Sequence, residues 1–441
     1  MATDGLHKEH LARLHARAAE LGIDGYRRLA RERLIEEISA RGGGEPPAAG
    51  DVEKDAEPAS RSREREGSGR GRGGRGRAPR RDAEKREAEE SGSEGEPAAG
   101  VLDVVGAGHG FLRLNGLEPG SDDVYVSASQ IRRCELRSGD QVEGPARQPR
   151  RGERHPALVR IERVNGAEPG SERNTSFDEL TPVRPSRRIP MRPDPEAILA
   201  RAADLVAPLA FGQRVLIVSE PHSGRTTLLR QLTRAIAAAD DAPGVIVLLV
   251  DERPEEVTEW KRQAEGVEIA AAAADLEASD QVRHAELALA RAKRRAESGE
   301  DVVVIVDSLT RLGVAYRDPI AIKPVFGAGR EIEEEGRGSL TIIATLLRGS
   351  EDGEGAVEAV QTTESSTIVL DAELARAGVV PAIDFRLSGV VGEEQLRDPE
   401  ELDAARRLYE ELRGADPPVA AERLAERIRS SASNAELLSS L

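Results

Sequence analysis

The sequence of 441 residues has few cysteines, few aromatic residues and no long apolar runs. Cys134 is its single cysteine, so the chain cannot close an internal disulfide or build a cysteine-rich zinc framework. The longest apolar runs, such as residues 245–250 and 302–306, are far below the roughly 18 residues that span a membrane. Residues 1–20 are too charged for a signal peptide. We therefore expect a cytoplasmic protein with no membrane partner.

The charge balance is acidic, with 63 basic and 80 acidic residues and a net charge of -17. Such a balance argues against a phosphate-rich partner over the whole surface, although local basic stretches remain. Apolar residues make up 38% of the chain, which is enough for a sizeable core. At about 150 residues per domain, the length allows roughly three domains.

The first hundred residues divide into two parts. Residues 11–38 carry apolar side chains at three- and four-residue spacing, which predicts a small helical domain over 1–41. Residues 42–99 lose nearly all large apolar side chains, and we expect them to form a disordered insertion rich in Arg, Gly and Glu. Within it, the arginine-glycine stretch 69–77 (GRGRGGRGR) is either a nucleic-acid contact or a linker, and composition leaves both open.

Residues 100–165 alternate between apolar and polar side chains in short runs. Runs of this kind, separated by turn residues, are typical of a small antiparallel β-barrel. A connector rich in proline and arginine follows, at 166–195. The expected strands are 101–105, 110–114, 123–126, 141–144 and 157–161.

The remaining residues, 196–441, alternate buried strands with helices. This order predicts a mostly parallel, doubly wound α/β sheet with further helices at its C-terminal end. The expected strands are 215–219, 245–251, 302–307, 340–347 and 367–370, and the expected helices are 226–238, 255–264, 281–297, 398–413 and 419–441.

The turn after the strand at 215–219 has the placement of a phosphate-binding loop, SEPHSGRTT. Such a loop offers backbone N–H groups at a helix start, and a lysine to the terminal phosphates. Here Ser219 stands at the first glycine of the pattern and Arg225 at the lysine. By motif alone the match is weak, and a plain strand-to-helix turn is the default interpretation.

Two further strands end in acidic residues, Glu252 and Asp307. In open α/β sheets, ligands bind at the carboxyl ends of the strands. Glu252 would polarise an attacking water, while Asp307 through water and Thr226 directly would hold Mg²⁺. Each acid is also compatible with a helix cap, but three such features in this order favour nucleotide binding.

Several segments together identify a family resemblance. The chain resembles bacterial transcription termination factor Rho, a hexameric RNA-dependent ATPase and RNA translocase, outside residues 42–99 and the divergent C-terminal part. The resemblance implies a cold-shock-type (OB) RNA-binding barrel and a RecA-like P-loop ATPase domain. The segments that carry it are 108–113 (GHGFLR), 124–133 (VYVSASQIRR), 251–259 (DERPEEVTE), 307–311 (DSLTR), 326–328 with Arg330, 339–345 (SLTIIAT) and 381–384 (PAID).

The family also implies site residues and partners. The implied partners are single-stranded nascent RNA, RNA polymerase, ATP with Mg²⁺, and five further copies of the chain in a homohexamer. Glu252 and Arg225 are the implied catalytic residues. The implied nucleotide site is Ser219, Pro221, His222, Ser223, Gly224, Arg225, Thr226, Thr227 and Arg253, with Thr226 and Asp307 at the metal. The implied RNA site is His109, Phe111, Arg113, Tyr125, Glu153, Arg154 and His155, in which the histidines replace stacking aromatic residues.

The chain departs from the family pattern in the motor half. Ala372 and Gly378 stand at the arginine-finger positions, where Arg376 is the nearest arginine. One RNA-gripping loop is shortened to residues 314–324, and Gln361 replaces a lysine in the other.

These departures leave two functions open. A third function, that of a rotary or secretion-type ATPase, is disfavoured by the motifs. One is a working Rho, using ATP as a helicase to release transcripts. The other is an ATPase-impaired paralogue that regulates through RNA binding. An arginine finger is worth about 10³ to 10⁵ in turnover, so we expect ATP hydrolysis to be slow or absent, with nucleotide binding retained.

Overall fold

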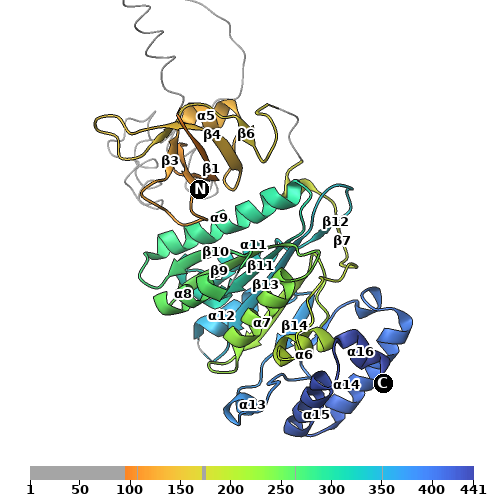
Figure 1. Ribbon diagram of the computed structural model, residues 1–441. Helices are drawn as coiled ribbons and strands as arrows, with labels where there is room; N and C mark the ends of the chain where they lie inside the picture. The colour runs from red at the N-terminus through yellow and green to blue at the C-terminus, as the bar shows by residue number, and fades with distance from the viewer. Residues whose placement is uncertain (1–94, 107, 171–174, 264, 350) are drawn as a thin grey trace, which may run out of the picture. The chain divides into compact units, whose positions relative to one another are not determined.

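The computed structural model describes residues 95–106, 108–170, 175–263, 265–349 and 351–441 (Figure 1). The expected helical domain 1–41 and nearly all of the expected insertion 42–99, with its arginine-glycine stretch, lie outside the described residues. The described residues form a barrel, followed in the chain by a larger domain of sheet and helices.

The barrel is the expected one and contains one helix that the sequence analysis missed. Its strands follow the order β1-β2-β3-β5-β4-β6, and a further pairing of β1 with β4 closes the first five positions into a ring. Buried side chains such as Leu102, Leu112 and Val142 fill the interior. The elements are β1 (Glu96–Val104), β2 (Gly110–Arg113), β3 (Val124–Val126), α5 (Ala128–Arg133), β4 (Gln141–Arg147), β5 (Ala157–Leu158) and β6 (Arg163–Val164).

The first strand begins earlier than the composition indicates. Residues 96–99 fall in the expected disordered insertion, yet they form the start of β1 and pair with residues 143–146 of β4. The expectation is wrong for these residues because backbone hydrogen bonds to a neighbouring strand require no large apolar side chain.

The larger domain contains a seven-stranded sheet in the order β10-β9-β11-β13-β8-β14-β15. All its pairings are parallel except that of β14 with β15. Its strands are β8 (Arg214–Ser219), β9 (Gly244–Glu252), β10 (Glu268–Ala273), β11 (Val302–Asp307), β13 (Leu340–Leu347), β14 (Ser366–Val369) and β15 (Gly389–Val390). A separate small ribbon pairs β7 (Pro182–Val183) with β12 (Glu331–Ile332).

Helices cover both faces of this sheet, which explains the nearly continuous apolar runs of its strands. In β9, Val245, Val247 and Leu249 pack into one apolar cluster, while Ile246 and Leu248 pack into the other. The helices are α6 (Ile198–Val206), α7 (Arg225–Ala237), α8 (Pro254–Gln263), α9 (Ala278–Glu297), α10 (Leu309–Tyr316), α11 (Lys323–Phe326), α12 (Glu351–Val360), α13 (Ala372–Arg376), α14 (Pro399–Gly414), α15 (Pro417–Arg429) and α16 (Asn434–Ser439). Short 3₁₀ turns are η2 (Phe177–Glu179), η3 (Pro319–Ile322) and η4 (Glu393–Gln395).

The parallel strands bring three expected site residues to one edge of the sheet. Ser219, Glu252 and Asp307 are the last residues of β8, β9 and β11. Among the described helices, none has both the length and the apolar character that crossing a membrane requires.

Candidate functional site

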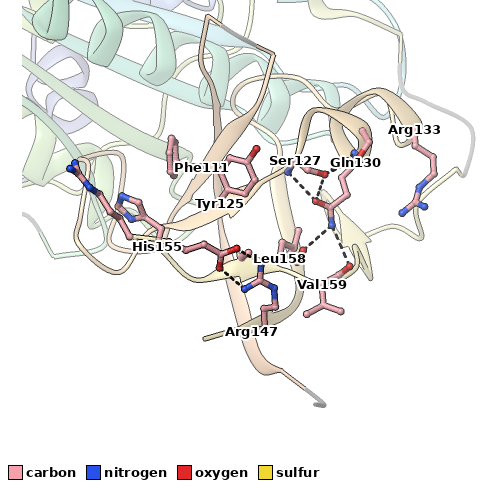
Figure 2. A pocket seen from close by; sticks show the side chains of 13 residues that line it. Phe111, Tyr125, Ser127, Gln130, Arg133, Arg147, His155, Leu158 and Val159 are labelled. Carbon is pink, nitrogen blue, oxygen red and sulfur yellow. Dashed lines mark hydrogen bonds and ion pairs between the residues drawn. The ribbon is translucent and has the colours of Figure 1, made fainter. Parts of the chain in front are cut away.

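The barrel carries a groove of about 650 Å³ (Figure 2). It is lined by five of the expected RNA-site residues and by eight others. The five are Phe111, Tyr125, Glu153, Arg154 and His155, and the others are Ser127, Ser129, Gln130, Arg133, Arg147, Ala157, Leu158 and Val159.

Aromatic rings gather at this groove. The Phe111 ring lies 5.1 Å from that of His155 and 5.9 Å from that of Tyr125, in edge-to-face arrangements. His109 lies 5.5 Å from Tyr125, and the Tyr125 side chain is 37% exposed. Planar rings held by their neighbours but open to solvent are suited to stacking against the bases of a single strand.

An ion pair orders the opposite wall of the groove. The Arg147 guanidinium donates two hydrogen bonds to the Glu153 carboxylate, at 2.6 and 2.8 Å, and the Arg150 N–H donates a third at 2.8 Å. These bonds, that from Arg147 first, lower the pKa of Glu153 to about 2. Glu153 therefore stays ionised across the physiological range, and Arg147 is fixed in orientation.

Arg113 is placed differently from the other expected RNA-site residues. It is 5% exposed, and its guanidinium forms ion pairs with the buried carboxylates of Asp103 and Asp123. The structure therefore does not bring Arg113 to the groove surface, although its guanidinium carbon lies 5.7 Å from the centre of the Phe111 ring.

The floor of the groove depends on the start of α5. Ser127 and Gln130 form a reciprocal capping box, and the Gln130 amide donates to the Leu158 carbonyl at 3.0 Å. Neither residue is among the predicted site residues, although a serine followed three residues later by glutamine is the usual signal of a capping box. Arg133 and Arg147 are also absent from the predicted site residues, because a single arginine in a sequence does not show whether its side chain reaches a groove.

In the larger domain, the turn between β8 and α7 has the geometry of an anion-binding loop. Gly224 caps α7 with a φ of +92°, a left-handed conformation that favours glycine, and His222 also has a positive φ of 64°. The buried Ser223 hydroxyl donates to the Glu220 carbonyl at 2.8 Å. The first N–H groups of α7 have no partner within the helix and are suited to phosphate oxygens.

The expected acids approach Arg225, the first residue of α7. Its Nε lies 3.2 Å from Asp307 Oδ1, and a terminal nitrogen lies 3.7 Å from Glu252 Oε1. Arg311, which the sequence analysis did not assign, pairs with the same Glu252 oxygen, and Thr345 donates to Asp307 at 2.9 Å. The two carboxylates and two guanidiniums form one charge cluster.

A backbone irregularity places Glu252 in this cluster. The register between β9 and β10 shifts after Val250, so Asp251 is bulged out of the ladder with a φ of 54°. Asp251 is exposed while Glu252 is buried. Bulges of this kind re-aim a side chain next to a functional site.

The remaining expected nucleotide residues surround this turn. Ser219 is buried and donates to the Leu346 carbonyl at 3.3 Å. Thr226 is half-buried, whereas the side chains that line the open side of the loop are exposed: Pro221, His222, Thr227 and Arg253.

The altered motor positions lie on short helical segments. Arg376, at the end of α13, is exposed and lies 3.3 Å from the Glu220 carboxylate of the same chain. Ala372 begins that helix, and Gly378 follows it. Gln361 lies exposed just after helix α12.

In this arrangement an arginine occupies the carboxylates that would face Mg²⁺. The ion requires oxygen ligands at about 2.0–2.1 Å in octahedral geometry, whereas the Arg225 guanidinium lies against both carboxylates.

Two protein families match parts of the chain. The RNA-binding domain of Rho termination factor matches residues 98–170. The nucleotide-binding domain of the ATP synthase alpha/beta family matches residues 200–322. The first match contains the groove and the second contains the phosphate loop, both carboxylates and Arg311.

Curated relatives named transcription termination factor Rho are similar over most of the chain. The Bacillus subtilis protein is 39% identical over 76% of this chain and 83% of its own length, and the Aquifex aeolicus protein is 39% identical over 78% and 84%. The Streptomyces lividans protein is 40% identical over 78% of this chain, which spans 51% of that longer relative. A solved type III secretion system ATPase is 22% identical over 64% of this chain and 93% of its own, with a TM-score of 0.47.

Proposed function

This chain belongs to the family of transcription termination factors named Rho, and from that membership we propose that it binds nascent RNA and uses ATP to release transcripts. The proposed assembly is a homohexameric RNA translocase and helicase that acts on transcripts held by RNA polymerase. We propose the bacterial cytoplasm as the place of this action, since these partners occur there.

The aromatic cluster at the groove is the observation that supports RNA binding most strongly. Phe111, Tyr125 and His155 supply faces for bases, and Arg133 and Arg154 supply charge for phosphates. Phe111 and Tyr125 are the two Phe, Tyr or Trp residues of the described barrel, and both line the groove, which favours a binding role over core packing. Arg113 would contribute indirectly, by supporting the barrel behind Phe111.

ATP is the proposed ligand of the phosphate loop. Backbone N–H groups at the start of α7 would hold its phosphates together with Arg225, and Arg253 lies exposed beside the site. Glu252 is the proposed residue for orienting the attacking water. Mg²⁺ at Thr226 and Asp307 stays a prediction, because Arg225 would first have to leave the carboxylates.

We propose that hydrolysis is slow. The planar guanidinium of Arg225 contacts two carboxylates at the position where the family has the compact ammonium group of a lysine. Arginine and lysine are not interchangeable at such a position. The finger positions hold Ala372 and Gly378, and the loss of such a finger costs about 10³ to 10⁵ in turnover. The alternative of an RNA-binding regulator without turnover is not favoured by the similarity to proteins named as termination factors.

The test is ATP hydrolysis by the purified chain with and without poly(C), beside ADP binding on the same preparation. We expect slow hydrolysis that poly(C) stimulates, and loss of that stimulation in Phe111→Ala/Tyr125→Ala. ADP binding without any hydrolysis would favour the regulator, whereas the absence of both RNA and nucleotide binding would refute the proposal.

A further inference from the structure

Arg225 occupies the space between the two acids of the nucleotide site. Its side chain is 14% exposed, while the side chains of Glu252 and Asp307 are 11% and 2% exposed. The guanidinium therefore contacts both carboxylates where little water can screen them. This is the region in which a nucleotide-bound cation would meet Asp307.

The charges in this cluster already balance. Arg225 and Arg311 carry two positive charges, and Glu252 and Asp307 carry two negative charges. A divalent cation entering among these groups would add two positive charges without an unpaired carboxylate to receive them. Buried carboxylates that already pair with a guanidinium have little affinity for another cation.

The contact of Arg225 with Asp307 is also loosely aligned. Its Nε is buried and, among the described residues, has no hydrogen-bond partner, although it lies 3.2 Å from the Asp307 oxygen. Asp307 is held instead by the Thr345 hydroxyl at 2.9 Å. Because a guanidinium has five N–H donors, Arg225 can meet a phosphate while it stays between the two carboxylates.

We infer that Arg225 is a resident cation that pairs with Glu252 and competes with Mg²⁺ for Asp307, so that this site binds nucleotide with little dependence on the metal. The inference rests on the proposed nucleotide site and adds how that site treats its metal. A nucleotide brings its own negative charge, which Arg225 and the helix N–H groups meet directly. Mg²⁺ gains access to the carboxylates only to the extent that Arg225 leaves them.

The experiment measures the affinity of full-length protein for a fluorescent ADP in EDTA and in MgCl₂. ADP avoids hydrolysis, so the readout is binding alone. We expect the two dissociation constants of the wild type to agree within about threefold, because the Arg225 guanidinium already supplies the positive charge that Mg²⁺ would add. In Arg225→Gln, which keeps a polar planar head but removes the charge, we expect Mg²⁺ to strengthen binding by about tenfold or more.

Arg234→Gln is the matched control, since it makes the same change on an exposed position of α7 away from the cluster. It should keep the wild-type ratio. A wild-type ratio above about tenfold overturns the inference without any variant. A small ratio in both the wild type and Arg225→Gln also overturns it, because Arg225 would then not cause the metal independence. Failure of the wild type to bind ADP in either buffer would instead remove the proposed nucleotide site.

Discussion

Removing the charge of Arg113 should destabilise the barrel. Its guanidinium is the ion-pair partner of the Asp123 carboxylate, which is 3% exposed, and it also pairs with the buried Asp103. Breaking a buried pair by removing one partner costs about 3–5 kcal/mol, because the remaining charge stays buried without compensation. A domain has only about 5–15 kcal/mol of stability in total, so Arg113→Gln should make local opening of the barrel easy to detect.

Hydrogen exchange of the full-length protein, followed by mass spectrometry on peptides from β2 and β3, measures this opening. We expect faster exchange in Arg113→Gln, and partial recovery when Asp123→Asn is added, because the double variant leaves no unpaired charge at that site. Arg133→Gln, an exposed arginine of the groove, should leave exchange unchanged and weaken RNA binding. Unchanged exchange in Arg113→Gln together with lost RNA affinity would refute the reasoning and make Arg113 a direct RNA contact.

Three further outcomes follow from the two sites. Phe111→Ala with Tyr125→Ala should lose about 1–3 kcal/mol of RNA-binding free energy per ring, whereas Tyr125→Phe should keep its stacking contact. Filter binding measures these affinities, and an unchanged affinity in the double variant would show that RNA binds at another site. The Glu153 carboxyl should titrate near pH 2 by ¹³C NMR, and its pKa should rise in Arg147→Ala. The ion pair stabilises the folded barrel fully above the ordinary glutamate pKa, and this stabilisation is lost only as the pH falls through the lowered pKa. Arg225→Lys alone should not restore a fast motor, because the finger positions are altered as well, and robust poly(C)-stimulated turnover in that variant would contradict this.

The sequence predicted most of the sheet because its strands are runs of β-branched and other apolar residues. Strand β10 was missed, since its EIAAAA segment is rich in alanine, which favours helix when no partner strand is considered. The helix α5 was missed as well, although Ser127 and Gln130 carry its capping signal. The resemblance to the Rho family is confirmed by the curated relatives.

Part of the membership of the candidate sites could be predicted from the sequence, but their arrangement could not. Motifs placed Glu252, Asp307 and the phosphate loop at one sheet edge, because parallel strands end together. No local pattern could show that Arg225 reaches across to both acids, or that Arg113 turns inward to Asp123. These contacts join residues far apart in the chain and are set by packing rather than by spacing.

The groove is assembled from segments that begin at Phe111 and end at Val159, and it is complete only when the barrel ring is closed. A single strand bound there would recognise the folded barrel and not the unfolded chain, so binding and folding are thermodynamically linked. At a free RNA concentration of 100 times Kd, this linkage adds about 2.7 kcal/mol to the stability of the barrel. The transcript would thus act as a folding ligand, raising the melting temperature of the domain that captures it in proportion to the logarithm of its supply.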